Sequence, residues 1–216
     1  MICVIAKLAS DAAERLNILR KAVASKEQLV KPFHGHITIA AYLPDDEEFL
    51  PVCAEIIRDT SAFRIRYEKL EVLSATSIIA AVPSKPAALL ALHNRIAERF
   101  GKSLNRWTCG NDWYPHTTLL YDPDADLNVL CRKMQEYFVP FETCISRVEF
   151  SKAEETGYTI LCSVDLKQQT EISCLLRGKS KEQETQKRDN GKLFRIAGTF
   201  PEDPGEEKTG GRNWQI

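Results

Sequence analysis

Residues 36–42 read HITIAAY and residues 116–121 read HTTLLY, so two short runs of the chain open with the pattern His-x-Thr. Both runs are rich in apolar and β-branched residues, and a turn signal follows each of them, starting at Pro44 and at Asp122. These features predict two β-strands. Because residues i and i+2 of a strand point to the same face, each strand should present one imidazole and one hydroxyl side by side.

The same order of elements surrounds each of these strands. The two histidines lie 80 positions apart (116 − 36), and the same offset carries the alternating run that begins at Phe63 onto the run that begins at Thr143. We therefore expect a unit of strand, helix, histidine strand, helix and strand that occurs twice. The expected elements are 2–8, 11–26, 36–43, 47–58 and 63–73 in the first half, and 77–82, 85–100, 116–121, 127–138 and 143–152 in the second.

Such a duplication predicts an α+β fold with two pseudo-symmetric lobes, about residues 1–76 and 77–167. Each lobe would hold a mainly antiparallel sheet with helices on its outside, and the lobes would face each other across a central cleft. A last strand is expected at 158–166. The sequence then becomes charged and rich in Gly and Pro, so residues 168–216 are predicted to form a polar, largely flexible tail.

Composition limits the kind of protein and the kind of ligand. With 44% hydrophobic and 27% charged residues, the chain is typical of a globular protein. Its formal net charge is -1, so phosphate recognition must come from a local cleft, which favours small ligands over long RNA.

The expected location is the cytoplasm. Neither a signal peptide nor an apolar segment of membrane-spanning length is recognised, and no membrane contact is expected. Seven cysteines lie singly, without a CxxC pair, which is typical of reduced thiols and argues against a zinc site.

Two histidines and two threonines in one cleft would suit phosphodiester chemistry. An imidazole has an unperturbed pKa of about 6.5, so a neutral one can take a proton from the nucleophile and a protonated one can give a proton to the leaving oxygen. The hydroxyls of Thr38 and Thr118 could donate to the phosphoryl oxygens. His36 and His116 are thus the predicted catalytic residues, with no metal or other cofactor required, and the sequence leaves open which of them is the acid.

At these motifs the chain resembles the two-histidine (2H) phosphoesterases, which include 2′-5′ RNA ligase-like proteins and 2′,3′-cyclic phosphodiesterases. HITI at 36–39 fits the family pattern of histidine, hydrophobic residue, threonine or serine, and hydrophobic residue. HTTL at 116–119 departs from it at Thr117, where an aliphatic residue is more usual and where the side chain should face away from the cleft. Pro115, directly before the second motif, also looks like the family.

The resemblance covers roughly residues 1–167. It implies the bilobal α+β fold, catalysis without a metal, and substrates with a 2′,3′-cyclic phosphate or a 2′-5′ phosphodiester. The expected protein is a monomeric hydrolase, able in principle to run backwards and join ends, whose partners are RNA ends or a small nucleotide phosphodiester.

Aromatic residues precede both histidine strands, and their rings could stack on nucleobases. The alternative is that they cap the core of each lobe. His34 is read as a residue of the cleft rim rather than a metal ligand, because no nearby carboxylate or cysteine completes a site. His93, in the middle of a helical run, is expected to be half-buried or at the surface, without a chemical role. The aromatic residues predicted to bind substrate are Phe33, Trp113 and Tyr114.

Two other functions stay open. One is a non-catalytic RNA-binding or nucleotide-binding module, in which a motif residue would be expected to be lost, and none is lost here. The other is a phosphodiesterase for a small non-RNA substrate such as ADP-ribose 1″,2″-cyclic phosphate. Salt-dependent binding to an oligonucleotide would separate the RNA enzyme from this alternative.

Overall fold

The computed structural model describes residues 1–30, 32–44, 47–73, 76–84, 87–109, 113–154 and 157–168. The predicted tail therefore lies outside the described residues, apart from Gln168. No helix in the described ranges is both long enough and apolar enough to cross a membrane. The elements are β1 (Ile2–Lys7), α1 (Ser10–Lys21), η1 (Glu27–Leu29), β2 (His36–Tyr42), α2 (Phe49–Arg58), β3 (Phe63–Val72), β4 (Ile78–Pro83), α3 (Ala87–Phe100), η2 (Gly101–Ser103), η3 (Arg106–Thr108), β5 (Thr117–Tyr121), α4 (Leu127–Tyr137), β6 (Phe141–Ile145), β7 (Arg147–Glu154) and β8 (Gly157–Asp165).

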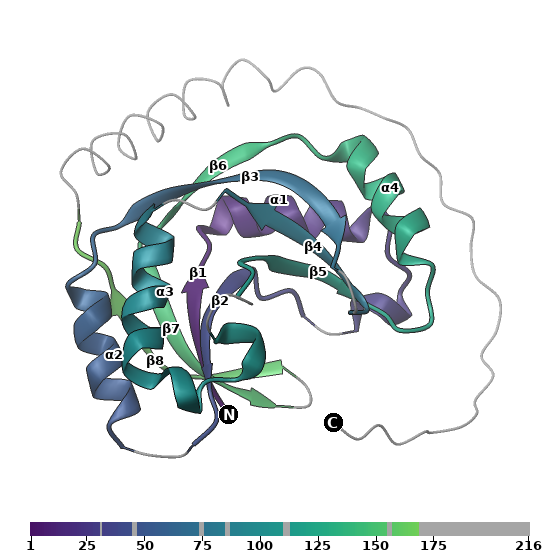
Figure 1. Cartoon of the computed structure of the whole chain (residues 1–216). Helices are drawn as coiled ribbons and strands as arrows, with labels where there is room; N and C mark the ends of the chain where they lie inside the picture. The colour runs from purple at the N-terminus through teal and green to yellow at the C-terminus, as the bar shows by residue number, and fades with distance from the viewer. Residues whose placement is uncertain are drawn as a thin grey trace. The chain divides into compact units, whose positions relative to one another are not determined.

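The strands of the described part form two antiparallel, four-stranded sheets (Figure 1). The first has the order β2-β1-β7-β8 and the second the order β5-β4-β3-β6. With the α-helices on their outer faces, these sheets confirm the predicted α+β fold. The two histidine strands, β2 and β5, are both edge strands, and they contact each other where the two sheets meet.

Neither sheet is built from one half of the sequence, so the predicted lobe boundary between residues 76 and 77 does not describe the sheets. β3, from the first half, pairs with β4 and β6, whereas β7, from the second half, pairs with β1. The single strand predicted at 143–152 is in fact two strands, because the chain passes between the sheets at Ser146. The burial pattern changes at this crossing: the buried residues before it are the odd-numbered Phe141, Thr143 and Ile145, and the first buried residues after it are the even-numbered Val148 and Phe150.

The pairing of β3 with β6 displays the duplication directly. Phe63 pairs with Ile145, and Ile65 pairs with Thr143. The offset of 80 exchanges the members of these two pairs (63 + 80 = 143 and 65 + 80 = 145). At the centre, Arg64 lies opposite Cys144, its own counterpart in the second repeat. The two repeats are therefore joined around a local twofold axis.

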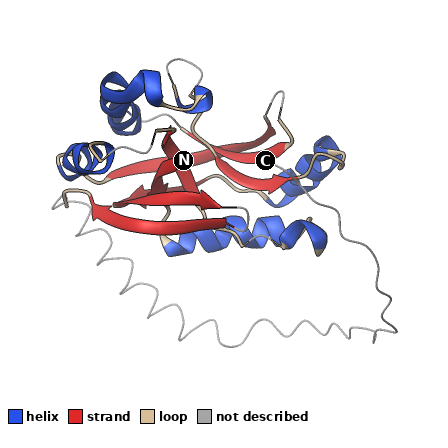
Figure 2. Ribbon diagram, turned by 90° about the horizontal axis from the view of Figure 1, so that it is seen from below, coloured by secondary structure: helices blue, strands red, loops and turns tan. Residues whose placement is uncertain are grey.

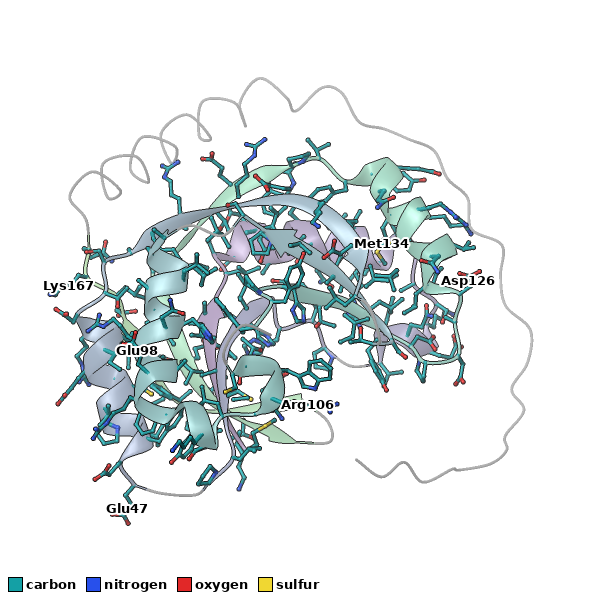
Figure 3. The ribbon with its side chains drawn as sticks, in the orientation of Figure 1. Glu47, Glu98, Arg106, Asp126, Met134 and Lys167 are labelled. Atoms are coloured by element: carbon teal, nitrogen blue, oxygen red, sulfur yellow. The ribbon has the colours of Figure 1, made fainter. Side chains whose placement is uncertain are left out.

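The helices cover the outer faces of the two sheets (Figure 2). α2 and α3 pack on the first sheet and on each other, while α1 and α4 pack on the second. Phe49 of α2 stacks on Tyr42 with 4.0 Å between ring centroids, and Met134 of α4, labelled in Figure 3, is fully buried. Each such side chain contributes ~1.5–3 kcal/mol through burial, so β2 and β5 are carried by a firmly packed scaffold.

Candidate active site

The two histidine motifs lie at the start of the facing edge strands. His36 is the first residue of β2, and His116 directly precedes β5. Each strand is irregular three residues after its histidine, because Ile39 and Leu119 are both skipped in the pairing with the neighbouring strand. Such β-bulges bend a strand and are frequent next to active sites. The duplication has thus placed the same bend after each motif.

Two side chains at the second histidine motif donate hydrogen bonds to the backbone of the first motif. The hydroxyl of Thr117 donates to the carbonyl oxygen of His36 at 2.9 Å, and the indole Nε1 of Trp113 donates to that of Thr38 at 3.0 Å. Thr117 is only 1% exposed, and its hydroxyl also lies 2.5 Å from that of Tyr67. The separation of the two motifs is therefore fixed by these two partly buried hydrogen bonds.

His36 lies in surroundings that disfavour its protonated form. Its ring stands edge-on to those of His34 and Tyr158, with 5.1 Å between centroids in both cases. Its Nδ1 is buried and lacks a hydrogen-bond partner in the described part of the chain. Burial, reinforced by the positive charges of His34, Lys7 and His116, lowers the pKa of His36 to about 3. His36 is therefore neutral around neutral pH.

His116 has surroundings of a different kind. Its Nδ1 lies 2.7 Å from the carbonyl oxygen of Tyr114, which makes Nδ1 the donor and leaves Nε2 available for a ligand. Burial lowers the pKa of His116, but the Tyr114 carbonyl and the charge of Glu71 both act to raise it. Glu71 is held in place by the hydroxyl of Tyr114 at 2.5 Å and by Lys69. Of the two imidazoles, His116 is the one whose protonated form is supported.

Two cavities meet at the histidine motifs. A larger cavity of about 630 Å³ and a smaller one of about 440 Å³ share Thr38, His116 and Tyr158 in their walls. Their linings are otherwise separate. The residues predicted from the sequence are all found here: His36, Thr118 and Phe33 line the smaller cavity, Trp113 and Tyr114 line the larger, and Thr38 and His116 line both.

Trp113 is packed more tightly than a free stacking surface would be. It is 7% exposed, and its ring lies flat on that of His93, with 3.8 Å between centroids. The prediction that His93 is half-buried or at the surface is wrong, because its helix face is turned towards β2. His93 is 2% exposed, and its Nδ1 lies 2.9 Å from the carbonyl oxygen of Ile39. Trp113 and His93 together support the first motif through the backbone carbonyl groups of Thr38 and Ile39.

Three residues beside the histidines carry no motif in the sequence. Tyr158 comes from β8 and reaches the site because β8 pairs with β7. Lys7 is the register partner of His36, and its Nζ donates to the carbonyl oxygen of His34 at 2.8 Å. Glu71, near the end of β3, lies close enough to influence the charge of His116, because β3 of the first repeat belongs to the same sheet as β5. No local pattern marks these positions, since each depends on strand pairing.

His34 lines the smaller cavity, in agreement with its predicted place on the rim. Its Nε2 lies 3.6 Å from a carboxylate oxygen of Glu149, and its Nδ1 lies 3.4 Å from Nζ of Lys7. Within the described ranges, no group of three or more His, Cys, Asp and Glu side chains is arranged to hold a metal ion.

Solved structures of low sequence identity share this fold. E. coli LigT in its apo form matches with a TM-score of 0.58 at 16% identity, over 77% of this chain and 97% of LigT. LigT in complex with 3′-AMP gives 0.59 at 14% identity, over 76% and 97%. The protein TT0787 of Thermus thermophilus gives 0.56 at 18% identity, over 78% and 98%. At these identities the likeness establishes the fold.

A comparison with curated protein sequences found no match. The family model described as the 2′-5′ RNA ligase superfamily matches residues 12–157, a range that includes both histidine motifs. The match agrees with the resemblance drawn from the motifs, and the chain belongs to the 2′-5′ RNA ligase superfamily.

Proposed function

We propose that this protein is a metal-independent phosphoesterase that hydrolyses, or reversibly joins, RNA-type phosphodiesters with a 2′,3′-cyclic phosphate or a 2′-5′ linkage. The observation that carries the proposal is the convergence of His36, His116, Thr38 and Thr118 on the wall of one cavity. Two imidazoles and two hydroxyl donors can serve both proton transfers and the charge on phosphorus. We place the enzyme in the cytoplasm, as a monomer that acts in RNA processing.

His36 is the proposed general base. A base has to be neutral before the reaction, and the depressed pKa of about 3 keeps His36 unprotonated across the physiological range. Its neighbour Lys7 adds positive charge, which opposes protonation of His36 but would attract the anionic phosphodiester.

His116 is the proposed general acid. The carbonyl of Tyr114 accepts from Nδ1, so a second proton on Nε2 points to the ligand rather than to the protein. Glu71 supports the imidazolium, and a bound phosphate dianion or monoanion would support it further.

The proposed hydrolysis then runs as a single displacement. The oxygen of a water molecule attacks phosphorus while His36 takes one of its protons, and the bond from phosphorus to the departing ribose oxygen breaks. His116 gives its Nε2 proton to that oxygen. The products are a phosphomonoester and a free hydroxyl, and Thr38 and Thr118 donate to the two non-bridging oxygens throughout.

Ligands of proteins with the same fold support a nucleotide substrate. E. coli LigT has been crystallised with 3′-AMP, with ATP, with NADP+ and with phosphate. All four contain phosphate, and three are nucleotides. The formal net charge of -1 favours small ligands of this kind for the present chain too.

The experiment that tests the proposal is product analysis of a short oligoribonucleotide that ends in a 2′,3′-cyclic phosphate, incubated with the protein in EDTA. Wild type should convert the cyclic end into one isomer of the terminal monophosphate, and His36→Ala and His116→Ala should each be slower by about 10²–10⁴-fold. Urea unfolding of each variant, compared with wild type, serves as the control for folding.

Other outcomes would redirect the proposal. Activity that EDTA abolishes would reject metal independence. Binding of the oligonucleotide without turnover would favour a non-catalytic RNA-binding module. Turnover of ADP-ribose 1″,2″-cyclic phosphate in place of the RNA end would favour a small cyclic nucleotide as the substrate.

A further inference from the structure

The imidazole of His36 is held in place in a different way from that of His116. Nδ1 of His116 donates to the carbonyl oxygen of Tyr114 at 2.7 Å, and this hydrogen bond fixes the orientation of its ring. Nδ1 of His36 is buried, and it has no hydrogen-bond partner within the described residues. A histidine side chain by itself restricts the rotation of its ring only weakly. The orientation of His36 must therefore come from the groups that pack around it.

Two rings pack against His36 and also against each other. The ring centroid of His36 lies 5.1 Å from those of both His34 and Tyr158, with interplanar angles of 76° and 80°. The rings of His34 and Tyr158 are themselves 5.7 Å apart. Edge-to-face contacts of this kind are favourable, and their energy depends on the angle between the rings. The three rings form a closed cluster that favours one orientation of the His36 imidazole.

Tyr158 is the member of this cluster that lies between His36 and the open cleft. It belongs to β8, the edge strand of the first sheet, and it lines both cavities at the histidine motifs. Tyr158 is 41% exposed, so part of it faces solvent while its ring covers His36. Burial is the largest cause of the low pKa of His36. A ring at this position can both orient the imidazole and keep water away from it.

Charged and titratable groups face His36 from other elements of the fold. His34 is held between Nζ of Lys7 on β1, 3.4 Å from its Nδ1, and the carboxylate of Glu149 on β7, 3.6 Å from its Nε2. His116 faces His36 from the second sheet. The charge of Lys7, and those of the two histidines when protonated, also lower the pKa of His36, but less than burial does. All these groups stay in place when a residue of β8 is replaced, so the effect of the ring can be measured separately.

Resting on the proposed function, in which His36 is the base, we propose that Tyr158 is a positioning residue of the reaction. Its ring acts through His36, because it holds the imidazole in one orientation and keeps water from its buried side. The base is then oriented and desolvated before the substrate binds, which lowers the barrier to the proton transfer. Tyr158 lies 122 positions after His36 (158 − 36), so the last strand of the described chain takes part in the chemistry of the first motif.

The test replaces Tyr158 by alanine, which removes the ring, and by phenylalanine, which keeps it. Ile160→Ala is the matched control, because Ile160 lies on the same strand, is 40% exposed and lines neither cavity. Tyr158→Thr repeats the alanine test with a small residue that suits a strand and so protects the folding of β8. Urea unfolding at each pH shows that the variants are folded.

The first measurement is the NMR titration of His36 in the protein without ligand, from about pH 7.5 to about pH 5, with His36→Ala to assign its signal. In wild type, Tyr158→Phe and Ile160→Ala, His36 should stay neutral throughout, because its pKa is about 3. In Tyr158→Ala and Tyr158→Thr the pKa should rise towards its ordinary value, so that His36 takes up a proton within this range. Since no ligand is present, stacking of a base on Tyr158 cannot cause the change.

The second measurement is the kinetics on the oligoribonucleotide that ends in a 2′,3′-cyclic phosphate. At about pH 7.5, Tyr158→Ala should lower kcat by about 10- to 100-fold, the effect of a loosely oriented base, whereas Tyr158→Phe should stay within about threefold of wild type. At about pH 5, kcat/KM of the alanine variant should fall by about a further 10-fold relative to wild type, because most of its His36 is then protonated.

Either of two results in Tyr158→Ala would overturn the proposal: a His36 that stays neutral at about pH 5, or a kcat equal to that of wild type. A rise in KM alone would assign Tyr158 to ligand contact instead. A phenylalanine variant that behaves like alanine would also overturn it, because the ring would then not be the effective group. If His36 titrates as expected but wild type turns over no substrate, the phosphoesterase proposal fails, while the action of Tyr158 on His36 stands.

Discussion

The hydroxyl of Thr117 donates to the carbonyl oxygen of His36 at 2.9 Å, and so a side chain of the second histidine strand holds the backbone of the first. Tyr67, from β3 of the second sheet, lies on the other side of the same hydroxyl at 2.5 Å. Because β2 and β5 are edge strands of different sheets, no strand pairing fixes their separation. This buried bridge does so instead.

Replacement of Thr117 by valine is expected to lower kcat by about 10- to 100-fold, since small displacements of a reacting group have effects of that size. Valine keeps the shape but leaves the His36 carbonyl and the Tyr67 hydroxyl without this partner. The free energy of unfolding should fall by about 1–3 kcal/mol. Steady-state kinetics and urea unfolding check the two effects.

Thr117→Ser is the matched control, because it keeps the hydroxyl and loses only a methyl group. Its kcat should stay within a few-fold of wild type. If valine and serine reduce kcat equally, the hydrogen bond to His36 has no part in positioning, and only the packing of the methyl group matters.

The pH dependence of kcat/KM should report the two histidines. The base must be neutral, and the pKa of His36 near 3 puts that limit far below neutral pH. The acid must be protonated, so the rate should fall as the pH rises through the pKa of His116, which burial holds below its ordinary value. Activity towards the cyclic or the linked substrate should thus decline on the alkaline side.

Glu71→Gln should move this alkaline limb to lower pH. The carboxylate of Glu71 raises the pKa of His116, so its removal lowers that pKa further and deprotonates the acid earlier. Glu68→Gln, an exposed position on the same strand, is the control and should leave the limb in place. A limb that stays put in Glu71→Gln, or moves upwards, would speak against His116 as the acid.

Stability should fall as the pH drops below about 6.5, before most carboxylates titrate. The pKa of every histidine, His34, His36, His93 and His116, is lowered, chiefly by burial. Below the ordinary histidine pKa the unfolded chain binds protons that the folded protein does not, so unfolding is favoured. Each histidine that stays neutral in the folded state should cost about 1 kcal/mol between pH 7.5 and 5.5. Urea unfolding at these two pH values checks this, and equal free energies would contradict it.

Truncation after Gln168 should leave both activity and stability unchanged. β8 ends at Asp165, and the last backbone hydrogen bonds within the described residues are those of Lys167 with Thr60 and Ala62. A second truncation, after Ser163, is the comparison, because it removes the end of β8 and should destabilise the first sheet. Thermal unfolding and steady-state rates are measured for both truncated proteins. A large loss of activity or stability in the protein that ends at Gln168 would assign a role to residues 169–216.

The order of strands and helices could be read from the sequence because it depends on local patterns. Alternation placed the histidine strands, helical spacing placed the helices, and the offset of 80 revealed the repeat. Side chains two residues apart lie on the same face of a strand. The placement of His36 beside Thr38, and of His116 beside Thr118, therefore also followed from local structure. Those four residues do line the same cavity.

The sequence contains only a weak signal for the point where the chain passes from one sheet to the other. The change in burial phase between Ile145 and Val148 corresponds to two consecutive polar residues, Ser146 and Arg147. Such a short interruption resembles the ordinary noise of an alternating strand. The exchange of β3 and β7 between the repeats therefore cannot be read from the sequence, because pairing between distant strands leaves little local trace.

The sequence by itself determined which groups can do the chemistry, since the motifs supply two imidazoles and two hydroxyls on strands of a repeated unit. Only the tertiary structure decided how the two histidines differ. The motifs are alike, but His36 lies among positive neighbours with Nδ1 buried, while His116 donates to Tyr114 and lies near Glu71. Proton affinity depends on burial and on charges brought in by strands far apart in the chain, and no motif contains these.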